Sequence, residues 1–485
     1  MSRQPKISRR GFLGGMAALG ALGVGGCAGS SGGVTASAPA GRPGGGPSSG
    51  GTLPGRGEFV VRDAYVMPMD TALGEFPRGD VHVRNGEIVA VGPNLAAPGA
   101  ETIDGRGMIA LPGLVETHWH MWNTMLRSMA GDKDGRGYFP TVAALGKEYT
   151  PGDQYRAVRL AAAEALFSGL TTVHDWCHNA REPAYADADL QALRDAGIRA
   201  RFSYGHAQGQ PLDAAINLDD LARVQREWFA RPGEGLLTLG FAGRGTVCPP
   251  AVYRREWETA RKLGIPITVH ADSAPRQRDM VATMFKEGML GKDVQLVHAI
   301  QSSPADFENI ARAGSSVSVS PYTELRIGYG FPKTSELLAA GVLVSLSLDT
   351  CALCGNADMF GVMKGIQNVA NARAQNEYHL LPRRVLELAT INGARAMGIG
   401  DRVGSLTPGK RADLILVSTT DINMAPFTEP AHLLVEAAQP WNVDTVVVDG
   451  RILKRGRKLV ALDVEQVVRE ATESFNAVRR RANWG

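Results

Sequence analysis

Two histidines one residue apart, His118 and His120, end an apolar run that begins at Met108. Side chains alternate faces along a β-strand, so residues two apart point the same way. Both imidazoles therefore project together from the end of a predicted strand, an arrangement that suits two ligands of one metal ion. Pairs of this kind also arise by chance, so the prediction depends on the polar residues that follow.

Three further polar side chains each come directly after a short apolar run: His270, His298 and Asp349. The runs are continuous rather than alternating, which is typical of parallel strands buried on both faces. Each polar group thus lies at the carboxyl end of a predicted strand, where barrel enzymes carry their chemistry. Taken singly, His298 could be a core histidine bonded to a carbonyl, and Asp349 could be a helix N-cap.

Strands of this type alternate with predicted helices. The first predicted strand ends at Glu116, and the next seven cover residues 170–173, 198–204, 236–241, 265–269, 294–297, 315–319 and 342–348. The predicted helices include residues 155–167, 187–195, 254–263, 278–289, 304–313 and 334–340. This α/β pattern predicts a (β/α)8 barrel of the TIM type over residues 111–400. An open doubly wound sheet is the alternative, but the glycine-rich phosphate loop after its first strand is missing.

Strand-and-turn patterns flank the predicted barrel on both sides. Residues 57–110 contain short strands joined at Asn85-Gly86, a dipeptide typical of hairpin turns. Residues 401–460 return to the same pattern, with a turn at Asp449-Gly450. We predict that the two segments form one small β-sandwich built from both chain ends, followed by an amphipathic surface helix in residues 461–485.

The first part of the chain predicts export. Residues 1–27 contain the pair Arg9-Arg10 in a context that resembles a twin-arginine signal peptide, followed by a short Gly/Ala-rich run. The sequence that ends at Cys27 resembles a lipobox, so Cys27 is predicted to carry a lipid, with residues 28–56 as a flexible linker. The alternative is that Cys27 is incidental and that cleavage falls after Ala38. The predicted location is the cell envelope, lipid-anchored or else periplasmic or extracellular, and the export partner is the twin-arginine machinery.

Composition excludes one class of partner. Hydrophobic residues make up 44% and charged residues 21% of the chain, as in ordinary soluble proteins. The net charge of +3 falls to −1 without the basic residues of the signal, which are Arg3, Lys6, Arg9 and Arg10. The chain therefore offers no basic surface for nucleic acid. A small-molecule substrate is the predicted partner, a lipid anchor at Cys27 is the predicted membrane contact, and the oligomeric state stays open.

A CxxC motif, Cys351 to Cys354, follows Asp349 almost directly. No second CxxC is present to complete a structural zinc site, and the sequence around it is not thioredoxin-like. We interpret the two cysteines as packing residues or as an adventitious disulfide.

Longer motifs are more specific than any histidine pair. From about Phe59 to Lys458 the chain resembles the amidohydrolase superfamily, in particular its cytosine-deaminase-like and triazine-hydrolase-like members. The segments that carry this resemblance are residues 103–107, the sequence PGLVETHWH at residues 112–120, and residues 169–173, 389–394, 404–414 and 446–451.

The resemblance implies a role for each polar residue at a strand end. His118 and His120 would bind the metal from the first strand, and His270 from the fifth. Asp349 would complete the ligand set and serve as the catalytic base, while His298 would hydrogen-bond the substrate or the attacked group. Binuclear relatives carry a bridging lysine on the fourth strand, and residues 236–241 contain none. One divalent ion is therefore expected, with zinc preferred and iron or manganese as alternatives.

One position departs from the deaminase pattern. The deaminases of this group place a glutamate three residues after the strand-five histidine, where it passes protons to the leaving amine, and this chain has Ser273 there. Asp272 could substitute if the strand continues, because it would share the face of that histidine. Glu324, after the seventh strand, is a second candidate. A water held by Asp349 and His298 alone is a third.

The predicted function is that of an exported metal-dependent hydrolase, deaminase-like, that cleaves a C–N bond in a cyclic or substituted nitrogen compound. Metal binding lowers the pKa of water from about 15.7 to near 7, Asp349 would take the proton and pass it to the leaving group, and His298 would stabilise developing negative charge. The alternatives are a lactam- or dipeptide-type amide hydrolase, and a lipid-anchored binding protein that has kept the barrel but lost its chemistry.

Aromatic and histidine residues near the strand ends complete the candidate site. Trp122 and Trp176 are predicted to contact a planar substrate ring, although ordinary packing accounts for them equally well. His174 is expected to orient its neighbours rather than to form a second metal site with His178.

Overall fold

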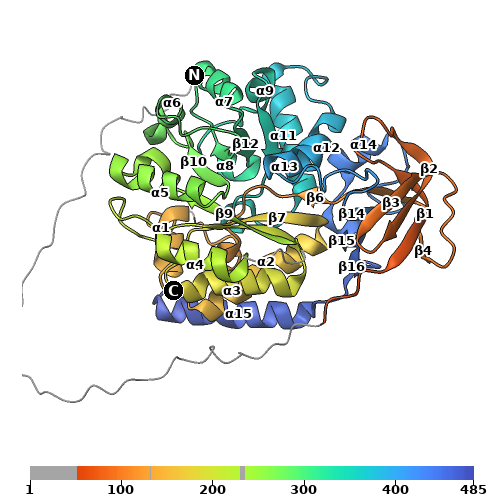
Figure 1. The fold of residues 1–485 in the computed structure, drawn as a ribbon, viewed down its shortest axis with the longest axis horizontal. Helices are drawn as coiled ribbons and strands as arrows, with labels where there is room; N and C mark the ends of the chain where they lie inside the picture. The colour runs from red at the N-terminus through yellow and green to blue at the C-terminus, as the bar shows by residue number, and fades with distance from the viewer. Residues whose placement is uncertain (1–51, 132, 230–234) are drawn as a thin grey trace, which may run out of the picture. The chain divides into compact units, whose positions relative to one another are not determined.

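The computed structural model describes residues 52–131, 133–229 and 235–485. The predicted signal with Cys27, and most of the predicted linker, lie outside the described residues. In the described part the chain forms an eight-stranded parallel sheet and a second sheet made from both of its ends (Figure 1). None of the helices in these residues combines the length and the apolar composition needed to cross a bilayer.

The parallel sheet is the predicted barrel, which confirms the α/β class. Its strands hydrogen-bond to one another in chain order. Trp119, just after the first of them, forms parallel bridges with Asp175 and with Asp349, so the first and last strands meet as well. The barrel strands are β6 (Leu114–Val115), β7 (Leu170–Cys177), β8 (Arg199–Tyr204), β9 (Leu237–Gly243), β10 (Ile267–Ala271), β11 (Val294–His298), β12 (Ser316–Val319) and β13 (Leu343–Leu346).

The apolar run before His118 belongs to two sheets rather than to one strand. Met108–Pro112 forms strand β5 of the second sheet, and only Leu114–Val115 enters the barrel. Gly113 lies between them, and a Cβ atom there would come within 2.1 Å of the Thr171 side chain. Glycine is therefore needed where the chain passes from one sheet to the other.

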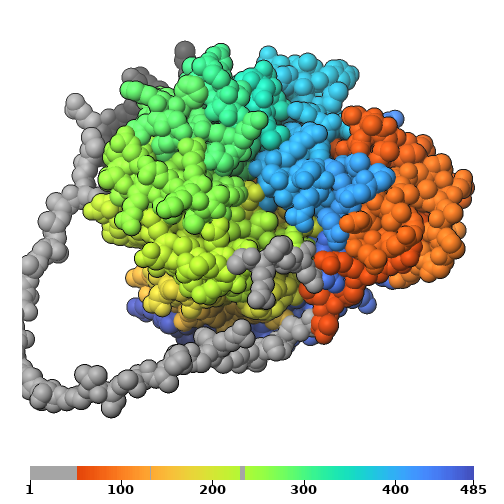
Figure 2. All heavy atoms as spheres, in the orientation of Figure 1, coloured from red at the N-terminus to blue at the C-terminus, as the bar shows by residue number. Residues whose placement is uncertain are grey.

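Nine strands from both chain ends form the second sheet, which confirms that the predicted small β-domain is built from both chain ends. The two ends meet where β5 pairs antiparallel with β14, and the orange and blue segments lie side by side (Figures 1 and 2). Asn85 and Gly86 have φ angles of 51° and 85°, as the predicted hairpin turn requires. Besides β5, the strands are β1 (Glu58–Val66), β2 (Phe76–Arg84), β3 (Glu87–Gly92), β4 (Glu101–Asp104), β14 (Leu414–Ser418), β15 (Val443–Val448), β16 (Arg451–Arg455) and β17 (Lys458–Leu459).

Capping residues decide where the helices begin. Helix α2 begins at Pro151, four residues before the predicted start, because Thr150 and Asp153 form a capping box. The α-helices are α1 (Tyr138–Gly146), α2 (Pro151–Phe167), α3 (Pro183–Ala196), α4 (Leu218–Trp228), α5 (Pro250–Lys262), α6 (Met280–Lys286), α7 (Pro304–Ala313), α8 (Pro321–Ile327), α9 (Thr334–Ala339), α10 (Cys351–Cys354), α11 (Met359–Ala374), α12 (Pro382–Ala389), α13 (Ile391–Ala396), α14 (Pro430–His432) and α15 (Val464–Arg481). Short 3-10 or π turns cover Met121–Leu126, Gly245–Val247, Pro275–Gln277, Leu433–Ala437 and Pro440–Asn442.

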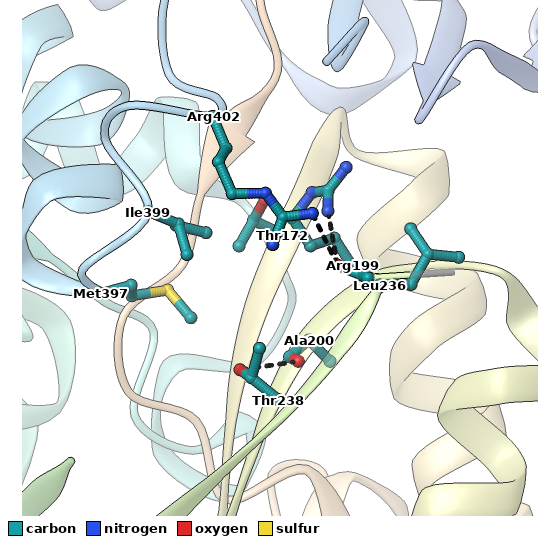
Figure 3. Close-up of a pocket in the computed structure, with 9 residues that line it drawn as sticks. Thr172, Arg199, Ala200, Leu236, Thr238, Met397, Ile399 and Arg402 are labelled. Carbon is teal, nitrogen blue, oxygen red and sulfur yellow. Dashed lines mark hydrogen bonds between the residues drawn. The ribbon is translucent and has the colours of Figure 1, made fainter. Parts of the chain in front are cut away.

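Two arginine side chains meet at the amino end of the barrel strands. Arg199 and Arg402 both donate to the Gly235 carbonyl, at 3.0 and 3.3 Å, above a small pocket lined in part by Met397 and Ile399 (Figure 3). The pocket holds about 10 Å³, which is space for about one water. This pocket is therefore too small for a substrate.

Candidate metal centre

The four residues expected to bind a metal lie together at the carboxyl end of the barrel. His118 and His120 follow β6, His270 lies in β10 and Asp349 follows β13. One ligand atom from each lies within 4.8 Å of all the others. Asp349 Oδ1 is 3.3 Å from Nε2 of both His118 and His120, and the Nε2 atoms of His118 and His270 are 3.1 Å apart.

Backbone hydrogen bonds hold the two ends of this cluster together. Asp349 has a left-handed φ of 63°, its amide donates to the His118 carbonyl at 2.9 Å, and its carbonyl accepts from the His120 amide at 2.7 Å. The Glu116 carboxyl, fully buried, accepts from the amides of His118 and Leu348 at 2.9 and 3.0 Å. Burial raises the pKa of Glu116 to about 8 against these amide bonds. The first and last barrel strands are thus joined at the ligands.

The histidines of the cluster are in the neutral state that binding of a metal cation requires. His120 Nδ1 lies 3.0 Å from the Trp176 carbonyl, which can only accept, so Nδ1 carries the hydrogen and Nε2 offers its lone pair to the cluster. Burial, followed by the neighbouring histidines, holds the pKa values of His118 and His270 well below the usual range. Three neutral imidazoles and a carboxylate are a donor set that zinc takes readily.

His298 lies beside the cluster and is paired with a buried carboxylate. Its Nδ1 donates to Glu324 Oε1 at 3.0 Å, and its Nε2 is 3.9 Å from Asp349 Oδ2. Burial acts to lower the pKa of His298, but the Glu324 hydrogen bond and the charges of Asp349 and Glu324 outweigh it, so the pKa is raised. Its φ of 76° is left-handed, which is uncommon for a residue other than glycine.

A cavity of about 340 Å³ opens above the cluster. Its walls include His120, His270, His298 and Asp349, together with aromatic and polar residues from other strand ends. Those further residues include Tyr138, Phe139, Trp176, His178, His206, Gln208, Arg244, Ser273, Arg276 and Tyr329. The volume lies at the lower end of the range found for small-molecule sites.

The two tryptophans differ in their access to this cavity. Trp176 lines it and packs edge-on against the rings of His118, His120 and His270, with ring centroids 5.8, 5.0 and 4.5 Å away. Trp122 is fully buried, is not part of the wall, and donates from Nε1 to His178 Nδ1 at 3.2 Å. Only Trp176 is therefore placed to contact a substrate directly.

The structure does not bring Asp272 into the cavity. Strand β10 ends at Ala271, and Asp272 has a φ of 47°, so the strand alternation that would align it with His270 is broken. Its oxygens accept from the Met280 amide at 2.9 Å and the Ser302 hydroxyl at 2.7 Å. This correction removes Asp272 as a substitute for the deaminase glutamate.

Glu324 is likewise not part of the cavity wall. It is fully buried and accepts from His298 Nδ1 and from the Ser320 amide, at 3.0 and 2.8 Å. The direct substrate contact expected of it is therefore corrected to an indirect role through His298. Ser273 does line the cavity, is only 2% exposed, and its hydroxyl has no hydrogen-bond partner in the described part of the chain.

A second metal cluster is absent from the described residues, where a single group of potential ligands is found. His174 is buried, with Nδ1 donating to the Thr117 carbonyl at 2.8 Å and Nε2 accepting from the Ser203 hydroxyl at 2.7 Å. It therefore supports the strand that carries His118, as expected. Strand β9 contains no lysine. Cys351 and Cys354 are free thiols.

The sequence reasoning overlooked His206 and Arg276, which both line the cavity. His206 comes two residues after β8, as other site residues follow their strands, so the same signal could have found it. Arg276 lies in a 3-10 turn after β10, and nothing in its sequence context marks it.

Comparisons with known proteins agree with this geometry. The amidohydrolase family matches residues 109–453. A 5-methylthioadenosine/S-adenosylhomocysteine deaminase of Desulforudis audaxviator is 31% identical over 437 residues, covering 85% of this chain and 97% of its own. A 5'-deoxyadenosine deaminase of Methanosarcina acetivorans is 28% identical, with 88% and 99% covered.

Solved structures of similar fold also align with most of this chain. An adenosine deaminase from Xanthomonas campestris with bound zinc has a TM-score of 0.78 and 26% identity over 88% of this chain and all of that one. The zinc complex of an atrazine chlorohydrolase from Arthrobacter aurescens, 22% identical over 86% of this chain and all of its own, shares the fold with a TM-score of 0.76. By its extended match and its site, the chain belongs to the amidohydrolase family and is a hydrolase of carbon–nitrogen bonds other than peptide bonds.

Proposed function

We propose that this protein is a zinc-dependent deaminase of a heterocyclic amine, with purine nucleosides as the first compounds to test. The observation that carries the proposal is the cluster of three neutral imidazoles and Asp349 at the mouth of the barrel. The adenosine-type substrates in the names of the relatives support the choice of compounds. A divalent cation in that cluster supplies the Lewis acidity that activates water near neutral pH.

The chain's own residues then have separate tasks. Asp349 offers Oδ2 at 3.9 Å from His298 Nε2, so the two groups can exchange a proton through one water. Glu324 holds His298 Nδ1–H and thereby fixes the direction of Nε2. Since Asp272 is turned away, proton transfer to the leaving amine falls to Asp349 and His298.

Ser273 is also compatible with the alternative function, hydrolysis of a lactam or dipeptide amide. Its small side chain leaves room where the deaminases carry a glutamate, and a lactam or dipeptide amide could use the same water and base. The two reactions differ in which group gives a proton to the leaving nitrogen in the space beside Ser273. Dipeptides and lactams therefore belong in the substrate panel.

The test is turnover by zinc-loaded protein. Adenosine, 5'-methylthioadenosine, 5'-deoxyadenosine, aminotriazines, dipeptides and lactams are incubated with the wild type and with Asp349→Asn. Ammonia, ring opening and dipeptide cleavage are measured. We expect ammonia from at least one heterocyclic amine, and none with Asp349→Asn. Full zinc occupancy with no ammonia from any compound would contradict the proposal, and ring opening or dipeptide cleavage would favour the alternative.

We further propose export through the twin-arginine machinery and lipid attachment at Cys27, on the sequence of residues 1–27. Replacing Arg9 and Arg10 by lysine should keep the protein in the cytoplasm. Replacing Cys27 by alanine should release the exported protein from the membrane fraction. Labelling with a radioactive fatty acid would show whether Cys27 is modified, and membrane attachment that survives Cys27→Ala would contradict the lipid anchor.

A further inference from the structure

His178 lies beside the metal ligands without being one of them. It follows β7, lines the cavity and is 9% exposed. Its ring centroid is 4.1 Å from that of His120. A group at this place is next to the site at which the reacting carbon of a substrate has to lie.

Trp122 determines which ring nitrogen of His178 carries the proton. The indole Nε1 is 3.2 Å from His178 Nδ1, and an indole N–H can only donate. Nδ1 is therefore the acceptor, and the hydrogen of the neutral ring sits on Nε2. Trp122 is itself fully buried, packed edge-on against Tyr149 at 5.4 Å, which keeps its N–H aimed at His178.

The hydrogen on Nε2 lies at the opposite edge of the ring from Trp122, on a side chain that lines the cavity. Because the indole N–H donates to Nδ1, that nitrogen carries no hydrogen and the ring is neutral in this arrangement. Once a substrate excludes water from this edge of the ring, a donor left without a partner costs about 1–3 kcal/mol. An acceptor on the substrate would remove that cost.

We propose that His178 determines the specificity of the enzyme by donating a hydrogen bond from a fixed Nε2–H to an acceptor on the substrate ring. The acceptor is an unprotonated ring nitrogen or an exocyclic oxygen close to the reacting carbon. The inference rests on the proposed function and names the chemistry its substrate must present. A ring with C–H at that place leaves the donor unpaired and is rejected.

The tautomer can be tested without a substrate. In zinc-loaded protein labelled with 15N at histidine, long-range 1H–15N correlations should show His178 as the Nε2–H form, assigned through its loss in His178→Phe. Trp122→Phe should produce a mixture of tautomers. Trp257→Phe is the matched control, because that indole N–H donates to the Met289 carbonyl instead. An Nδ1–H form in the wild type, or no response to Trp122→Phe, would overturn the inference.

Recognition is tested by following the Nε2–H resonance while the substrate panel is added. We expect a downfield shift with the compound that is deaminated. For that compound, replacing the ring acceptor by C–H should weaken binding about tenfold, which is 1.4 kcal/mol, in the wild type and not in His178→Phe. Ammonia release without any shift would overturn this inference and leave the proposed function. A shift without ammonia release would support the hydrogen bond from His178 and contradict the proposed deamination.

Discussion

At the residue scale, the histidines of the site differ in how their surroundings act on their protonation. His118, His120 and His270 are kept neutral by burial, and neutral imidazoles are what a cation requires. His298 differs from them because the Glu324 carboxylate opposes the effect of burial and raises its pKa. In the proposed function, the same residue type is suited to be a metal ligand or a proton carrier according to its hydrogen-bond partner.

Glu324→Gln is predicted to lower kcat by roughly 10–100-fold, because the amide holds His298 less firmly and no longer supports a positive charge on it. Zinc content should stay at the wild-type level, since Glu324 touches none of the four ligands. Glu308→Gln, at an exposed position of α7, is the control and should leave both quantities unchanged. A fall in zinc content equal to the fall in kcat would contradict this division of roles.

At the element scale, the turns after the barrel strands decide which side chains reach the site. The sequence predicted His118 and His120 correctly as neighbours, and the continuous apolar runs predicted the ends of β10, β11 and β13 to within two residues. The same reasoning could not foresee Asp272, since a left-handed turn after β10 is not encoded by alternation. Nor could it foresee that Trp122, in a 3-10 turn, would be buried behind His178.

The contact between β16 and α2 makes the stability of the protein depend on pH. Lys454 of β16 is fully buried, donates to the Phe167 carbonyl of α2 at 2.6 Å, and has its pKa lowered by burial to about 7. Between pH 7 and the usual lysine value of about 10.4, the unfolded chain binds this proton and the folded protein does not. The free energy of unfolding therefore gains a contribution that rises with pH across that interval.

Lys454→Met is predicted to remove that rise. The variant should be more stable than the wild type near pH 7, with a difference that shrinks by pH 10, as measured by urea unfolding at both values. Lys458→Met replaces an exposed lysine of β17 and should leave the pH dependence unchanged. Parallel pH profiles for the wild type and Lys454→Met would contradict the assignment.

At the scale of the whole described molecule, buried ion pairs connect the barrel to the second sheet. Arg199 of β8 donates to Asp413 at 2.6 and 2.9 Å and lies 3.4 Å from Asp449. Arg411 and Arg56 also bind Asp449. The sequence predicted both sheets but not this network, because ion pairs between residues over 200 positions apart leave no local pattern.

Arg199→Met is predicted to destabilise the protein by about 3–5 kcal/mol, because Asp413 is left buried without its cation. Equilibrium unfolding in urea measures the change. Glu336→Gln breaks the more exposed pair with Arg373 and should cost only about 0–1 kcal/mol. Equal losses of unfolding free energy in the two variants would contradict the claim that burial determines how much an ion pair contributes to stability.

The claim on which the rest depends is that His118, His120, His270 and Asp349 bind one divalent cation together. The most direct measurement is anomalous diffraction at the zinc edge from crystals of zinc-loaded protein. The account predicts one zinc per chain, bound by three Nε2 atoms and Asp349. No anomalous peak at the cluster despite ample zinc, or a peak bound by other residues, would contradict it.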